Sequence, residues 1–148
     1  MTANKNEAPR IVVGVDGSPS SRAALRWAVD QAKLTGATVD AVIAWHIPAS
    51  MTGYGWTAPM VPDISFEDVA KQTLEEAIAE VVGSGEVPRV RSLVVPGIAA
   101  QVLLEASAEA DLLVVGRRGH GEFAEALLGS VSQHCVHHAH CPVLVVHA

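Results

Sequence analysis

The chain has 148 residues, 49% of them hydrophobic and 4% aromatic, and its formal net charge is −6. This length suits a single domain over residues 1–148, and the shortage of aromatic side chains favours small aliphatic residues packed between helices and a buried sheet. The acidic balance speaks against a nucleic-acid binder, and no stretch approaches the roughly 18 consecutive apolar residues of a membrane span.

The first residues of the chain are polar and hold no apolar stretch of signal-peptide length. We therefore expect a cytoplasmic protein that does not bind membranes, with residues 1–9 flexible. Cys135 and Cys141 are too few for a disulfide scaffold, and we expect both to remain thiols in a reducing cytosol.

Apolar β-branched runs then alternate with helix-length amphipathic stretches, which is typical of βαβ units and a parallel sheet. Strands are expected at residues 11–15, 38–45, 89–95, 111–116 and 141–146. Helices are expected at residues 20–34, 65–82, 99–108 and 130–138. Residues 48–62 are expected to form a long loop, and loops of that length often serve a function.

The helix boundaries rest on short local signals. Ser20 or Ser21 can cap the first helix after the turn-forming residues 16–19, and Gly36 is expected to end it. The second helix is expected to bury five apolar side chains that recur at helical spacing: Val69, Leu74, Ala77, Ile78 and Val81.

Five parallel strands joined by right-handed crossovers, with helices on both faces, predict a Rossmann-like α/β domain of strand order 3-2-1-4-5. Ligands of such sheets bind outside the carboxyl ends of the strands where the winding reverses, here between strands one and four. Residues 14–18 and 116–121 follow these two strands and are the most glycine-rich strand exits of the sequence. Both arguments select one crevice.

The most informative stretch lies near the end of the chain, where Gly116, two arginines and Gly119 are followed by nine residues and then by Gly129 and Ser130. Glycines let the backbone fold closely around a ligand. A helix that begins at Ser130 would point free N–H groups and its positive dipole end at phosphate. The spacing therefore predicts an anion site and favours nucleotide binding.

Individual roles can be assigned within this site. The backbone amides of Gly119, His120 and Gly121 are expected to form an anion-binding nest. The Ser130 hydroxyl and the Val131 amide are expected to meet phosphate, although Ser130 could also serve as a helix cap.

Three charged residues border the same crevice. Arg117 and Arg118 could contact phosphate or remain solvated. Asp16 would repel phosphate, so we expect it to accept from a ribose hydroxyl or to hold a divalent cation such as Mg²⁺. Alternatively, Asp16 caps its own turn. The sequence contains neither the G-x-x-x-x-G-K-[ST] motif nor, after the first strand, G-x-G-x-x-G.

Three stretches of the chain resemble the universal stress protein family: residues 11–18, the glycine pattern over residues 116–130, and residues 138–146. The glycine spacing is similar to that of the ATP-binding branch of the family. The resemblance covers essentially the whole chain, and it implies an ATP-binding, Rossmann-like stress-response protein that dimerises by pairing the last strands of two subunits.

The resemblance also implies where the nucleotide is bound. The adenine edge is expected to meet the backbone near Trp45, and the remaining contacts are expected at Gly14, Asp16, the run from Gly116 to Glu122, Gly129, Ser130 and Val131.

A histidine-rich segment at the end of the last helix invites a zinc hypothesis, since His134, His138 and Cys141 would share one face of a longer helix. Histidines near a helix C-terminus also favour its dipole, and we expect no metal site here. No catalytic residue is assigned, because His120 alone does not make a catalytic arrangement.

The leading hypothesis is a regulatory ATP-binding stress protein with slow or no ATP hydrolysis, read by protein partners that the sequence does not identify. A weak ATPase on the same fold is one alternative. A binder of AMP or cyclic AMP is another, because the predicted site would serve any adenine nucleotide.

Overall fold

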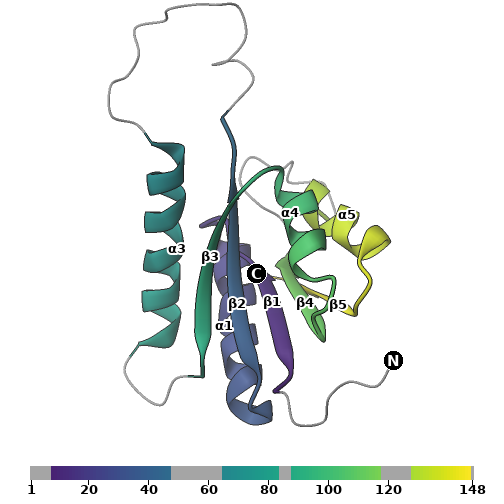
Figure 1. Cartoon of the computed structure of the whole chain (residues 1–148). Helices are drawn as coiled ribbons and strands as arrows, with labels where there is room; N and C mark the ends of the chain where they lie inside the picture. Colours follow the sequence, from purple (N-terminus) through teal and green to yellow (C-terminus); the bar gives the residue numbers. More distant parts are fainter. Residues whose placement is uncertain (1–7, 48–64, 84–87, 118–127, 148) are drawn as a thin grey trace, which may run out of the picture.

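The computed structural model describes residues 8–47, 65–83, 88–117 and 128–147. The described residues form a five-stranded parallel sheet in the order β3-β2-β1-β4-β5, which confirms the predicted order (Figure 1). The strands are β1 (Arg10–Gly14), β2 (Thr38–Trp45), β3 (Val90–Pro96), β4 (Leu112–Gly116) and β5 (Val143–Val146). The helices are α1 (Pro19–Thr35), α3 (Phe66–Val82), α4 (Ala99–Ala106) and α5 (Ser130–His138).

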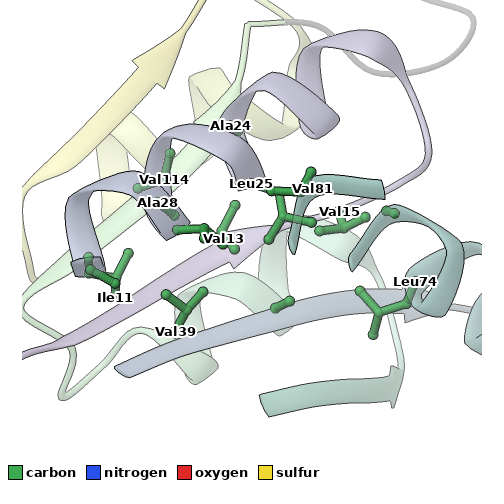
Figure 2. Close-up of a cluster of buried hydrophobic side chains, with 14 of the residues drawn as sticks. Ile11, Val13, Val15, Ala24, Leu25, Ala28, Val39, Leu74, Val81 and Val114 are labelled. Atoms are coloured by element: carbon green, nitrogen blue, oxygen red, sulfur yellow. The ribbon is translucent and has the colours of Figure 1, made fainter. Parts of the chain in front are cut away.

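Two hydrophobic clusters lie on opposite faces of the sheet. The larger one packs α1 and α3 against β1 and β2, and Figure 2 shows Leu25 and Leu74 among its aliphatic side chains. The smaller one includes Leu103 of α4 and Cys135 of α5, packed against the other face. In Figure 1, α4 and α5 lie side by side, with α1 on the far side of the sheet. Helices therefore cover both faces, as predicted.

The predicted cap of the first helix, Ser20 or Ser21, was wrong by two or three residues. Ser18 is the N-cap, and its side chain accepts a hydrogen bond from the Ser21 N–H group. Pro19 occupies the first helical position, where its fixed φ is helical and its missing N–H group costs no hydrogen bond. The helix ends as predicted at Gly36, whose φ of 76° lies in the left-handed region that glycine adopts readily.

Helix α3 has the predicted bounds, with Ser65 as its cap, but one of its inner residues was assigned wrongly. Val69 is 55% exposed, whereas the neighbouring Ala70 is buried. The buried positions Ala70, Leu74, Ala77 and Val81 follow a strict three-and-four spacing, which excludes Val69 from the inner face.

The last strand is shorter than expected, because it begins at Val143 and leaves Cys141 and Pro142 in the preceding connection. Strands β3 and β5 form the two edges of the sheet. Residues 1–7 and the expected 48–62 loop lie outside the described residues. In the part of the chain that is described, no helix is long and apolar enough to cross a membrane.

A buried ion cluster crosses the sheet on the α4 and α5 side. Asp40 of β2 is 2% exposed and accepts hydrogen bonds from Arg10 Nε at 2.6 Å and from Arg91 Nε and Nη2 at 3.0 and 2.9 Å. Arg10 also donates from Nη2 to the Ala106 carbonyl at the end of α4. The cluster therefore ties β1, β2, β3 and α4 together.

Candidate functional site

A cavity of about 340 Å³ opens at the carboxyl ends of β1 and β4. Its volume is in the range of small-molecule sites, and its position is the winding reversal at which open parallel sheets bind ligands. The cavity is lined by Gly14, Val15, Asp16, Ser21, Val42, Ala44, Ala99, Leu103, Val115, Gly116, Gly129, Ser130, Val131 and Ser132.

Six of the predicted site residues line this cavity although they come from distant parts of the chain: Gly14, Asp16, Gly116, Gly129, Ser130 and Val131. The structure does not place Trp45 or Arg117 among the lining residues. The predicted contacts from Arg118 to Glu122 lie outside the described residues.

Two of the glycines that line the cavity are closely packed. A Cβ atom on Gly116 would lie 2.6 Å from the backbone carbon and Cβ of Ser20, so the end of β4 passes directly against the first turn of α1. A Cβ atom on Gly14 would lie 2.7 Å from Cδ1 of Leu103. The end of β4 therefore needs glycine for packing, independently of any ligand, whereas a larger residue at position 14 would require the Leu103 side chain to move.

The first turn of α1 borders the cavity but is closed by its own side chains. Asp16 Oδ1 accepts from the Ser18 N–H at 2.8 Å, and Ser18 Oγ accepts from the Ser21 N–H at 3.3 Å. Pro19 has no N–H group to offer. This helix end therefore has little remaining capacity to bind an anion. Asp16 does cap its turn, and its second carboxylate oxygen remains for another partner.

The first turn of α5 is built in the opposite way. Gly129 is the N-cap and supplies no side-chain hydrogen bond, and the first intrahelical bond runs from the Gln133 N–H to the Gly129 carbonyl. The amides of Ser130, Val131 and Ser132 have no acceptor among the described residues, as expected for an uncapped helix start. These three residues line the cavity.

Ser132 holds this helix start in place. Its hydroxyl, in a side chain that is 2% exposed, lies 2.9 Å from the Arg117 carbonyl and 3.1 Å from the Gly129 carbonyl. The Gly129 N–H also donates to the Arg117 carbonyl, at 2.7 Å. The hydroxyl thus joins the start of α5 to the end of β4.

Trp45 and Arg117 take part in the sheet rather than in the cavity wall. The Trp45 carbonyl accepts from the Gly97 N–H, and its side chain packs against the α1 and α3 cluster. The Arg117 N–H donates to the Val146 carbonyl at 2.8 Å. Within the described part of the chain, neither Trp45 Nε1 nor Arg117 Nε has a hydrogen-bond partner.

Ionisable side chains are scarce among the described residues that line the cavity. Asp16 is the one ionisable side chain among its described lining residues. Both thiols are free and lie outside the lining, and burial raises the pKa of Cys135 to about 11 and raises that of Cys141. Neither cysteine is therefore a reactive thiolate near neutral pH.

A family model described as "Universal stress protein family" matches residues 8–147, which is nearly the whole chain. The chain belongs to the universal stress protein family. Universal stress protein Rv2623 of Mycobacterium tuberculosis is 33% identical over 148 residues, which cover 96% of this chain and 48% of that protein. A universal stress protein of Mycolicibacterium smegmatis is 35% identical over 143 residues, covering 93% and 47%. The chain spans about half the length of these curated relatives.

Solved universal stress protein structures share the fold. The protein UspA from Lactobacillus plantarum is 24% identical with a TM-score of 0.74, and the match covers 95% of this chain and 99% of that one. A structure titled as a universal stress protein in complex with cAMP is 29% identical with a TM-score of 0.59, covering 95% and 97%.

Several lining residues of this universal stress protein were missed by the sequence analysis. Val42 and Ala44 point to the cavity side of β2, and strand alternation beside the winding reversal could have identified them. Ala99 and Leu103 of α4 carried no such signal, because their position depends on how α4 packs across the sheet.

We expect Ser132→Ala to lower the free energy of unfolding by about 0.5–1.5 kcal/mol, because it removes a buried hydrogen bond while the Arg117 and Gly129 carbonyls each keep a backbone donor. Urea denaturation measures this loss, and Ser92→Ala on the exposed side of edge strand β3 is the control. ATP affinity should fall as well, since the Gly129 amide is then the one described hydrogen bond between the start of α5 and the Arg117 carbonyl. Unchanged unfolding and unchanged ATP binding would contradict the role given to this hydroxyl.

Proposed function

We propose that this universal stress protein binds an adenine nucleotide, foremost ATP, in the cavity between β1 and β4. The observation that carries the proposal is the first turn of α5, where three residues line the cavity and their amides have no acceptor among the described residues. Free N–H groups at a helix N-terminus, together with the helix dipole, form a phosphate site. The competing turn of α1 is already capped by its own side chains.

The rest of the lining suits the other parts of a nucleotide. Val42, Ala44 and Leu103 provide an apolar wall against which a flat base can pack. Asp16 stands at the polar side with one carboxylate oxygen bonded to the Ser18 amide, so the other can accept from a ribose hydroxyl or hold Mg²⁺. The backbone near Trp45 remains the proposed contact for the adenine edge.

Cyclic AMP is a second candidate ligand, because a structure 29% identical to this chain is titled as a complex with cAMP. AMP fits the same argument, since one phosphate would be enough to engage the α5 amides. ATP is placed first because a longer phosphate chain can meet both these amides and a cation at Asp16.

The proposed role is that of a regulatory nucleotide-binding protein rather than a fast enzyme. Asp16 is the one ionisable side chain found among the described lining residues, which gives little means for rapid proton transfer. We further propose that two copies pair through β5 in the cytoplasm, because β5 is an edge strand made of four apolar residues. Other proteins would then bind the nucleotide-bound form in preference to the empty form.

Isothermal titration calorimetry with ATP, AMP, cyclic AMP and adenosine tests this assignment. We expect ATP to bind more tightly than adenosine, because only the phosphates meet the α5 amides, and we expect Mg²⁺ to tighten ATP binding. Mass spectrometry of any copurified nucleotide identifies the cellular ligand. Equal affinities for ATP and adenosine would contradict the phosphate site, and hydrolysis at many turnovers per minute would favour the enzyme alternative.

A further inference from the structure

Helix α5 carries a pair of histidines that the nucleotide site does not use. His134 and His138 lie one turn apart on an exposed face, and their ring centroids are 4.6 Å apart. Residues at this spacing are neighbours on a helix surface, so both rings can turn toward one ion. Imidazole is a common ligand of divalent transition metals.

We propose that His134 and His138 form a surface chelating site for a divalent transition-metal ion of the Ni²⁺, Cu²⁺ and Zn²⁺ class. The two imidazole rings provide two ligands, and water completes the coordination. The same spacing of two helical histidines supplies the ligands in the H-E-x-x-H zinc motif. An ion held by two side chains exchanges with solvent, unlike a structural zinc site with four protein ligands.

The position of the pair on the helix favours a cation. His138 is the last residue of α5, where the unpaired carbonyl groups give the helix its negative dipole end. The formal net charge of −6 also attracts cations to the protein as a whole.

This site differs from the zinc site considered from the sequence. Helix α5 ends at His138, so Cys141 does not continue its face and lies in the connection before β5. No group of three or more metal-ligating side chains occurs within the residues that the structure covers. The inferred site is therefore the histidine pair alone, and it lies at the end of α5 opposite to the cavity-lining turn.

Calorimetric titration of untagged, nucleotide-free protein with Ni²⁺ tests the proposal. We expect one strong site per chain. Either His134→Gln or His138→Gln should weaken binding at least about tenfold, because the second imidazole of a chelate acts at high effective concentration. His140→Gln and His147→Gln are controls on exposed histidines outside α5 and should leave the affinity unchanged.

Thermal unfolding provides a second measurement. Ni²⁺ should raise the melting temperature of the wild-type chain and of the controls but not of the double variant His134→Gln/His138→Gln, since a ligand stabilises only a state that binds it. No Ni²⁺ binding by the wild type, or an equal loss in the control variants, would overturn the proposal. The test does not depend on whether the cavity binds a nucleotide.

Discussion

Ser130→Glu is expected to reduce ATP affinity on the order of a hundredfold while leaving the fold as stable as before. Ser130 is the first residue of α5, is exposed, and lines the cavity. A carboxylate placed there would stand among the free amides and repel the phosphates, and juxtaposed like charges cost several kcal/mol. Calorimetry with ATP and with adenosine measures the effect, which should be absent for adenosine.

The matched control is Ser130→Gln, which has nearly the same size without the charge. We expect it to weaken ATP binding far less than Ser130→Glu does. A negative charge in the first turn of a helix is itself stabilising by about 0.3–1 kcal/mol, so urea denaturation should show Ser130→Glu to be no less stable than the wild type. If the two variants weaken ATP equally, the loss is steric, and the phosphates do not lie at the start of α5.

Asp40→Asn is expected to cause the largest loss of stability, about 3 kcal/mol at neutral pH. Asp40 is the shared acceptor of Arg10 and Arg91, and removing one partner from a buried ion cluster typically costs about 3–5 kcal/mol. The lower end applies because the Arg91 side chain is 62% exposed and keeps much of its hydration. Urea denaturation measures the loss, with the exposed Asp30→Asn on α1 as the control.

The same carboxylate makes stability depend on pH. Burial by itself would raise the pKa of Asp40, but the hydrogen bonds and positive charges of Arg91 and Arg10 outweigh burial and lower it. Its contribution is therefore fully present above the ordinary aspartate pKa of about 3.9 and is lost as the pH falls through the lower pKa of the folded state. Stability of the wild type should thus fall more steeply in acid than that of Asp40→Asn. Parallel curves would contradict this.

The strands, the helices and their order in the sheet could be predicted from the sequence, because they depend on local residue patterns. Neighbouring residues in the sequence determine the buried apolar run of β4 and the end of α1 at Gly36. The strand order follows from general rules for how strands are connected. The cap of α1 was placed wrongly because three serines follow one another closely and only Pro19 fixes which of them starts the helix.

The lining of the cavity was predicted in part, and the residues that were missed depend on packing. Glycine spacing pointed to Gly116 and Gly129, which line the cavity. The role of Ser132 could not be predicted, because it requires the end of β4 to lie within hydrogen-bonding distance of α5. The Asp40 cluster was missed for the same reason, since Arg10 and Arg91 become its neighbours only when the strands pair.

The backbone of Arg117 has a consequence for how such sites change in evolution. Its N–H is bonded to β5 and its carbonyl to both Gly129 and Ser132, so main-chain atoms anchor the helix start. These hydrogen bonds can form with any side chain at this position except proline, which has no N–H group. We therefore expect the residue type at this position to vary among homologues. Low conservation in an alignment would then hide the structural role of its backbone.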